Sequence, residues 1–123
     1  KMTDAVSQSD YNKAAAILGD LLKMQEEPIV ILAALGSQLR RLYTARMAID
    51  SGKDKYWLME LWEMRSDYPA KLLLQSAKRV SAQWCGDAAK MCQVVDLRMK
   101  SQRGADPVEE LKLLLARLGA ARK

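Results

Sequence analysis

ILAALGSQLRRL, residues 31–42, decides the fold class of this chain. Four leucines recur in it at intervals of three and four residues: Leu32, Leu35, Leu39 and Leu42. This period lines one face of an α-helix with apolar side chains. The pattern begins after Pro28, a residue that is well tolerated in the first turn of a helix. It ends before Ser51-Gly52, where a helix commonly stops. We therefore predict a long amphipathic helix from residue 28 to about residue 51.

Further amphipathic segments with start and stop signals lie on both sides of this helix. Apolar runs are preceded by residues whose side chains are of the kind that caps helix starts: either Ser9 or Asp10 before the first, and then Asp54, Ser81 and Asp106. The expected helices are a ragged first segment at 3–7, then 11–25, 28–51, 55–64, 69–80, 82–102 and 107–119. The sequence thus predicts an all-α fold, a compact bundle of about six to seven helices.

Composition supports the same fold class. The chain has 18 Leu, 17 Ala and 7 Met but only 6 Val, 4 Ile and 2 Thr, so straight-chain helix formers far outnumber β-branched residues. Its 123 residues suit a single domain with one core. No apolar run approaches the roughly 18 residues of a membrane span, and no cleavable signal pattern opens the chain, so we expect a soluble, cytoplasmic domain. Because the first residue is Lys1 rather than Met, we expect a fragment of a longer polypeptide.

The residues needed for catalysis or for metal and cofactor binding are missing from the sequence. It has no histidine, which removes the commonest general base and the commonest metal ligand. Gly52-Lys53 lacks the spacing of a phosphate-binding loop. Cys85 and Cys92, seven residues apart on one expected helix, lie about 10 Å apart and cannot form a disulfide. We expect reduced, half-buried thiols, no catalytic residues, no cofactor and no metal site, and hence no enzymatic activity of this domain by itself.

One carboxylate stands in a stripe that we expect to face inward. One face of the helix at 82–102 carries Cys85, Ala89, Cys92, Asp96 and Met99, and Arg103, directly after its expected end, continues the same face. A partly buried Asp96 needs a partner, which could be Lys100 one turn later or an arginine of a neighbouring helix, Arg40 or Arg41. Alternatively, Asp96 lies at the edge of the stripe and is solvated.

Other apolar residues lie off the expected stripes. On the helix at 69–80 we expect Leu72, Leu73, Ala77 and Val80 to face inward. Four apolar residues lie off the core-facing positions expected for their own helices: Leu74, Leu113, Trp57 and Trp62. They are either satellites of the core or contacts for a partner protein.

The charge is biased toward the second half of the chain. The net charge is +5, and residues 65–123 contribute 12 basic and 6 acidic residues. A helical DNA-binding module is therefore an alternative function, in which phosphates would be contacted by Lys71, Lys78, Arg79, Arg98, Lys100 and Arg103. No short turn between two helices offers a clear recognition helix, which ranks this alternative second.

Two stretches read together resemble a known family. The sequence resembles the C-terminal domain of the delta subunit of the bacterial DNA polymerase III clamp loader. The resemblance lies in Ile31–Leu35 continued by Gln38–Leu42, and then in Tyr68–Leu72. The order and spacing of other residues agree with that family: Asp10, Ala14, Leu18, Leu21 and Leu22 before them, and Gln75, Ala77, Asp96, Lys100 and Leu111–Leu118 after them. The resemblance spans about residues 3–119. The delayed Gly104 departs from the family pattern and leaves the end of the helix at 82–102 open.

The resemblance implies an oligomerisation (collar) role for the whole of residues 1–123, in a DNA-directed DNA polymerase holoenzyme that loads the sliding clamp onto primed DNA. It implies other clamp-loader subunits (gamma/tau and delta prime) as partners, the sliding clamp as a partner of an absent ATPase-like N-terminal part, and weak or indirect contact with nearby DNA. It does not imply a membrane. The residues expected at subunit interfaces are Arg40, Arg41, Leu113 and Arg117, followed by Lys100 and Arg103.

Overall fold

The computed structural model describes residues 11–101 and 106–121, and throughout these ranges the regular structure is helical, without strands. The helices are α2 (Tyr11–Lys23), α3 (Pro28–Asp50), α4 (Lys55–Leu61), α5 (Tyr68–Ala77), α6 (Ala82–Ser101) and α7 (Pro107–Ala121). The predicted all-α class is confirmed. The expected segment at 3–7 and Gly104 lie outside the described residues.

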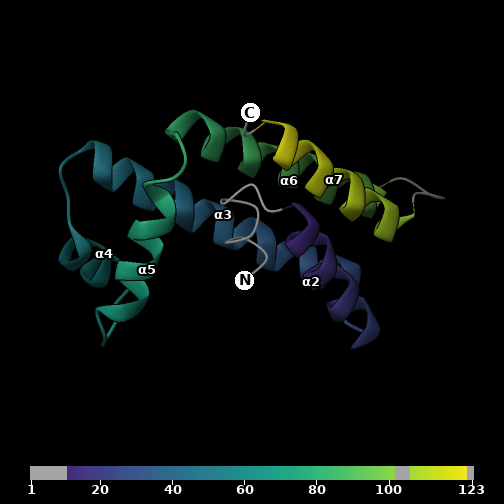
Figure 1. The fold of residues 1–123 in the computed structure, drawn as a ribbon, viewed down its shortest axis with the longest axis horizontal. Coiled ribbons are helices and arrows are strands. Elements are labelled where there is room, and N and C mark those ends of the chain that lie inside the picture. The colour runs from purple at the N-terminus through teal and green to yellow at the C-terminus, as the bar shows by residue number, and fades with distance from the viewer. Residues whose placement is uncertain (1–10, 102–105, 122–123) are drawn as a thin grey trace.

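The long helix α3 is the axis of the molecule (Figure 1). α6 packs along it, and α7 lies beside α6 and also contacts α2. α4 and α5 pack together near the C-terminal end of α3, where they form a separate corner. The four helices α2, α3, α6 and α7 are called the bundle below, and α4 with α5 is called the α4–α5 corner.

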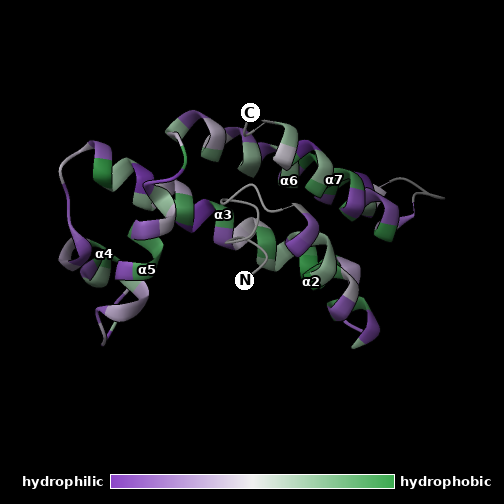
Figure 2. Cartoon of the chain, in the orientation of Figure 1, coloured by the Kyte–Doolittle hydropathy of each residue, from purple (hydrophilic) through white to green (hydrophobic). Residues whose placement is uncertain are grey.

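Leucine side chains build the core of the bundle. Leu32, Leu35, Leu39 and Leu42 of α3 are all at most 2% exposed, as the 31–42 pattern predicts. They meet a second leucine stripe on α7: Leu111, Leu114, Leu115 and Leu118. Figure 2 shows apolar residues on all the bundle helices. Burying a leucine contributes about 1.5–3 kcal/mol relative to leaving it in water, so these two stripes dominate the stability of the bundle.

Three predicted caps hold the helix starts. The Asp54 carboxylate accepts hydrogen bonds from the backbone N–H groups of Tyr56 and Trp57 at 3.1 and 3.3 Å. Ser81 Oγ accepts from the N–H of Trp84 at 3.0 Å. Asp106 accepts from the N–H of Val108 at 3.0 Å. Each cap satisfies N–H groups that a helix start otherwise leaves without a partner.

The structure corrects several sequence-based expectations. Leu72, expected inside, is 45% exposed, because the short α5 turns Ala70, Leu73 and Ala77 toward the core instead. α4 ends at Leu61 rather than near residue 64, and α7 continues to Ala121, past Gly119. The two cysteines are reduced but fully buried rather than half-buried.

Trp84 was not among the expected core residues, yet it is only 6% exposed. Its indole N–H donates to the backbone carbonyl of Leu118 at 3.3 Å, which ties the start of α6 to the end of α7. A buried indole usually needs such a partner.

Candidate subunit interface

A groove of about 840 Å³ runs between α3 and α6 and brings together residues far apart in the sequence. Small residues lie along it, Gly36 on α3 and Ala89 and Cys92 on α6. Polar side chains flank them, among them three of the residues singled out from the sequence: Arg40, Asp96 and Lys100. We call this feature the α3–α6 groove.

Asp96 pairs along its own helix. Its carboxylate lies 3.0 Å from the Lys100 ammonium, and the two side chains are 32% and 62% exposed. The partner is therefore the lysine one turn later rather than Arg40 or Arg41, and Asp96 lies at the edge of the buried stripe. Exposed pairs at this spacing contribute only a few tenths of a kcal/mol.

Arg40 lies along the groove wall. A Cβ built on Gly36 would come within 3.3 Å of the Arg40 guanidinium and within 3.7 Å of Cys92 Cβ, so the glycine leaves room for the arginine to lie close to α3. Burial raises the pKa of the Cys92 thiol to about 11, although the positive charge of Arg40 opposes this rise. The thiol is therefore protonated at neutral pH and is not an active nucleophile.

The other predicted interface residues lie elsewhere. Leu113, 44% exposed, and Arg117 one turn later are on the solvent-facing side of α7, called the α7 outer face below. Arg41 lies over the ring of Trp62, with its guanidinium carbon 5.1 Å from the ring centroid. Arg103 is outside the described residues. The structure thus brings Arg40 and Lys100 together but separates them from Leu113 and Arg117.

The apolar residues that lie off the expected stripes divide between satellites of the core and exposed positions. Leu74 and Trp62 pack against the core as satellites, whereas Trp57 is 37% exposed. The α4–α5 corner also exposes large apolar side chains that sequence reasoning missed: Tyr56 (64%), Leu61 (49%), Tyr68 (64%) and Leu72 (45%). For α4, the sequence did contain a signal for this exposure, because a helix of seven residues cannot bury apolar residues placed all around it.

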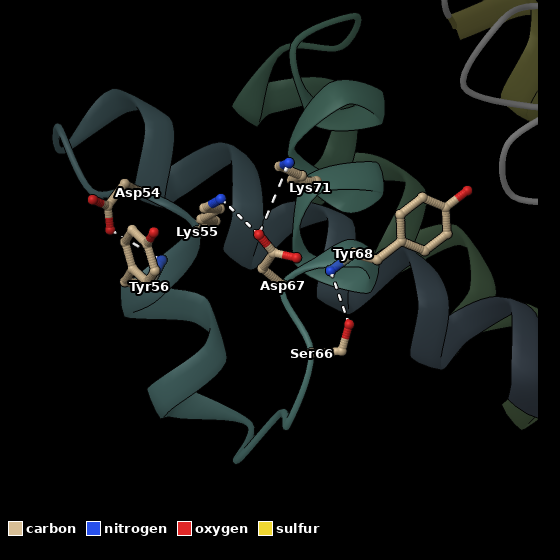
Figure 3. Close-up of polar contacts among 7 residues, drawn as sticks. All are labelled: Asp54, Lys55, Tyr56, Ser66, Asp67, Tyr68 and Lys71. Atoms are coloured by element: carbon tan, nitrogen blue, oxygen red, sulfur yellow. Dashed lines mark hydrogen bonds and ion pairs between the residues drawn. The ribbon is translucent and has the colours of Figure 1, made fainter.

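Polar contacts join the two helices of this corner. Asp67, directly before α5, lies between Lys55 of α4 and Lys71 of α5 (Figure 3). Its carboxylate is 2.7 Å from the Lys55 ammonium and 3.9 Å from that of Lys71. The hydrogen bond with Lys55 holds the pKa of Asp67 below its ordinary value, and the same bond raises the pKa of Lys55.

The described basic residues considered for DNA binding come from two parts of the fold. Lys71, Lys78 and Arg79 lie in or directly after α5. Arg98 and Lys100 are on α6, where they pair with Glu110 at 3.2 Å and Asp96 at 3.0 Å. A phosphate-binding face needs several unpaired cations in a row, so direct DNA contact stays a prediction.

Within residues 11–101 and 106–121, no group of three His, Cys, Asp or Glu side chains is arranged to hold a metal ion. Among the helices of those ranges, none has both the length and the hydropathy that crossing a membrane requires. Surface features of the described residues that could serve contact with other proteins include the α3–α6 groove, the α7 outer face and the exposed apolar side chains of the α4–α5 corner.

Known proteins share both the sequence pattern and the fold of this chain. The family model for the C-terminal domain of the DNA polymerase III delta subunit matches residues 1–118. A solved DNA clamp loader delta protein of Bacillus subtilis has the same fold, with a TM-score of 0.87 and 23% sequence identity. The match covers 97% of this chain but 34% of that one, so the chain spans about a third of that protein's length. Among curated proteins, none matches.

Proposed function

The chain belongs to the family formed by the C-terminal domains of DNA polymerase III delta subunits, and so to the proteins of DNA replication, and we propose that it acts as a collar domain. In this role it holds other clamp-loader subunits, of the gamma/tau and delta prime types, in one assembly. We assign residues 1–123 to this one domain, and the catalytic work belongs to other parts of the complex. The observation that carries the proposal is the family match over residues 1–118.

Two surfaces suit this role. The α7 outer face presents an exposed leucine, Leu113, beside the cation Arg117, and subunit interfaces typically combine an apolar centre with arginines near the edge. The α3–α6 groove presents small residues flanked by Arg40 and Lys100, a shape that admits the side chains of a neighbouring helix. Stable interfaces between proteins bury about 800 Å² per partner, which neither Leu113 nor the groove cations supply alone.

Clamp loading itself needs a further part. A full-length subunit would use its ATPase-like module to engage the sliding clamp, while this domain anchors the subunit to its neighbours. Primed DNA would then lie close to the domain without being held by it.

The test is assembly with purified gamma/tau and delta prime subunits, measured by gel filtration and sedimentation. Leu113→Ala combined with Arg117→Ala is expected to weaken assembly at least tenfold while helical content is unchanged. Arg40→Glu combined with Lys100→Glu tests the groove in the same way. A matched control is Met24→Ala combined with Lys23→Ala. Lys23 is the last residue of α2, and Met24, which is 70% exposed, follows it. This control also removes one exposed apolar side chain and one cation, but on another helix.

If both interface variants assemble as well as the unmodified chain, the placement of these surfaces is wrong. If the unmodified chain itself fails to bind any partner subunit, the collar role is wrong.

A further inference from the structure

A second, smaller pocket of about 240 Å³ opens between the C-terminal half of α3 and the start of α4. Its walls are Tyr43, Met47 and Trp57, which are 37%, 47% and 37% exposed. The buried Ala48 also lines it, and more polar residues, Thr44, Ser51 and Lys53, complete the lining. An engineered cavity of about 150 Å³ holds a benzene ring. This pocket, called the Trp57 pocket below, therefore has room for a bulky apolar side chain.

The rim of the Trp57 pocket carries one cation, Lys53, and the two carboxylates nearest to it in the sequence are engaged in contacts of their own. Asp50 is held by Arg46, whose guanidinium lies 2.6 Å from the carboxylate. Asp54 is held as the cap of α4. The ammonium of Lys53 has no ion-pair partner among the residues that the structure describes, and Lys53 is the only cation in the lining.

We propose that the Trp57 pocket binds a short acidic segment of a partner protein. A bulky apolar side chain of the segment fills the pocket between Tyr43, Met47 and Trp57, and a neighbouring carboxylate pairs with Lys53. The aromatic and thioether walls supply the apolar burial that makes such anchors energetically dominant in protein interfaces. The charge-assisted hydrogen bond to Lys53 then selects an anionic segment over a cationic one.

The geometry favours a protein segment over single-stranded nucleic acid. A nucleic-acid groove combines stacking platforms with a track of cations that follows successive phosphates. Here the next lysine along the chain, Lys55, is already held by Asp67 at 2.7 Å, and among the described residues that line the pocket Lys53 is the single cation. The aromatic side chains, moreover, are the walls of a pocket, which suits a side chain that enters rather than a row of bases.

The Trp57 pocket lies at the α4 end of α3, and the proposal does not depend on the collar role or on the α7 outer face. The experiment uses residues 1–123 and a fluorescein-labelled peptide, Gly-Asp-Leu-Phe-Asp-Gly, with binding followed by fluorescence anisotropy. One comparison peptide replaces both Asp by Lys, and another replaces Leu-Phe by Ala-Ala. The acidic peptide is expected to bind at least tenfold more tightly than either.

Substitutions in the chain sharpen the test. Lys53→Glu is expected to weaken the acidic peptide at least tenfold and to improve binding of the lysine peptide. Trp57→Ala is expected to weaken the acidic peptide at least tenfold, and circular dichroism checks that α4 stays folded. Lys78→Glu and Tyr56→Ser are matched controls: one reverses an exposed lysine outside the pocket, and the other removes an exposed aromatic ring outside its lining.

The proposal is overturned if the lysine peptide binds the unmodified chain as tightly as the acidic one, or if Lys53→Glu leaves both affinities unchanged. It is also overturned if a thymidine oligonucleotide binds in place of the peptide and loses affinity in Trp57→Ala. Self-association of the chain that is lost in Lys53→Glu would likewise overturn it, because a second copy would then be the occupant.

Discussion

The bundle and the α4–α5 corner differ in how completely they bury their apolar side chains. In the bundle, two leucine stripes on α3 and α7 are almost completely removed from water. In the corner, Leu58 and Ala70 are fully buried apolar residues, and the ion pairs of Asp67 with Lys55 and Lys71 join the two helices. The corner also keeps Tyr56, Leu61 and Tyr68 in solvent. The difference teaches that the bundle buries its leucine stripes almost completely, whereas the corner folds on a few buried residues and leaves several large apolar side chains in solvent.

The largest expected effect is in the bundle. Leu39 is 0% exposed, and Leu39→Ala should lower the free energy of unfolding by about 2–5 kcal/mol, through lost burial and the cavity left behind. Leu61→Ala, at a position 49% exposed in the corner, should cost less than about 1 kcal/mol. Urea denaturation followed by circular dichroism compares the two, and equal losses would remove the distinction between the regions.

A smaller effect is expected at the start of α4. Asp54→Ala removes the cap that accepts two backbone N–H groups and should cost about 1 kcal/mol. Because α4 has only seven residues, the loss should appear as faster amide hydrogen exchange in α4, with exchange in α6 and α7 unchanged. Asp54→Asn, which can still cap, is the control. Uniformly faster exchange across all helices would show that the corner and the bundle unfold as one unit.

Asp96→Ala should have a still smaller effect on stability. The carboxylate lies at the edge of the buried stripe and pairs with an exposed lysine, so the expected loss is a few tenths of a kcal/mol. The melting temperature should fall by about 1–2 °C. Lys100→Ala should give the same shift, since the two substitutions remove the same pair. A drop of about ten degrees in a thermal scan, several times what an exposed pair can supply, would mean that Asp96 has a buried role beyond this pair.

The smallest expected effect is a local response to pH in the corner. The pKa of Asp67 is lowered from 3.8 by its hydrogen bond with Lys55. Its stabilising contribution is therefore complete above pH 3.8 and is lost as the pH falls through the lower pKa of the folded state. The pKa of Lys55 is raised from 10.5, so its stabilising contribution changes with pH in the opposite direction. The contribution is complete below pH 10.5 and is lost as the pH rises through the higher pKa of the folded state.

Amide chemical shifts of α4, measured by NMR between about pH 5 and pH 2, check the acid limb. The part of their movement that follows the titration of Asp67 should disappear in Asp67→Asn. Persistence of the same titration in that variant would assign it to another carboxylate.

The sequence was sufficient for most of the fold, because the period of Leu32, Leu35, Leu39 and Leu42 identifies a buried helix face without knowledge of its neighbours. The caps at Asp54 and Ser81 are equally local signals. Leu72 was misjudged because burial on a short helix depends on the neighbouring helix that it meets, which no local pattern contains.

The candidate interface was harder to predict. Arg40 and Lys100 are sixty residues apart, and their meeting in the α3–α6 groove depends on how α6 is rotated against α3. The Trp57 pocket was missed for the same reason, since Tyr43 and Met47 belong to one helix and Trp57 to another. Trp57 was recognised only as an off-stripe residue that could serve either the core or a partner.

The placement of two of the three tryptophans, Trp57 and Trp84, gives the molecule its own optical reporters. Trp84, 6% exposed and tied to Leu118, sits in the bundle and should emit at short wavelength, whereas Trp57, 37% exposed in the corner, should emit to the red. An aqueous quencher such as iodide would reach Trp57 and spare Trp84. Intrinsic emission can therefore follow the loosening of one region while the other stays intact, without attachment of any dye.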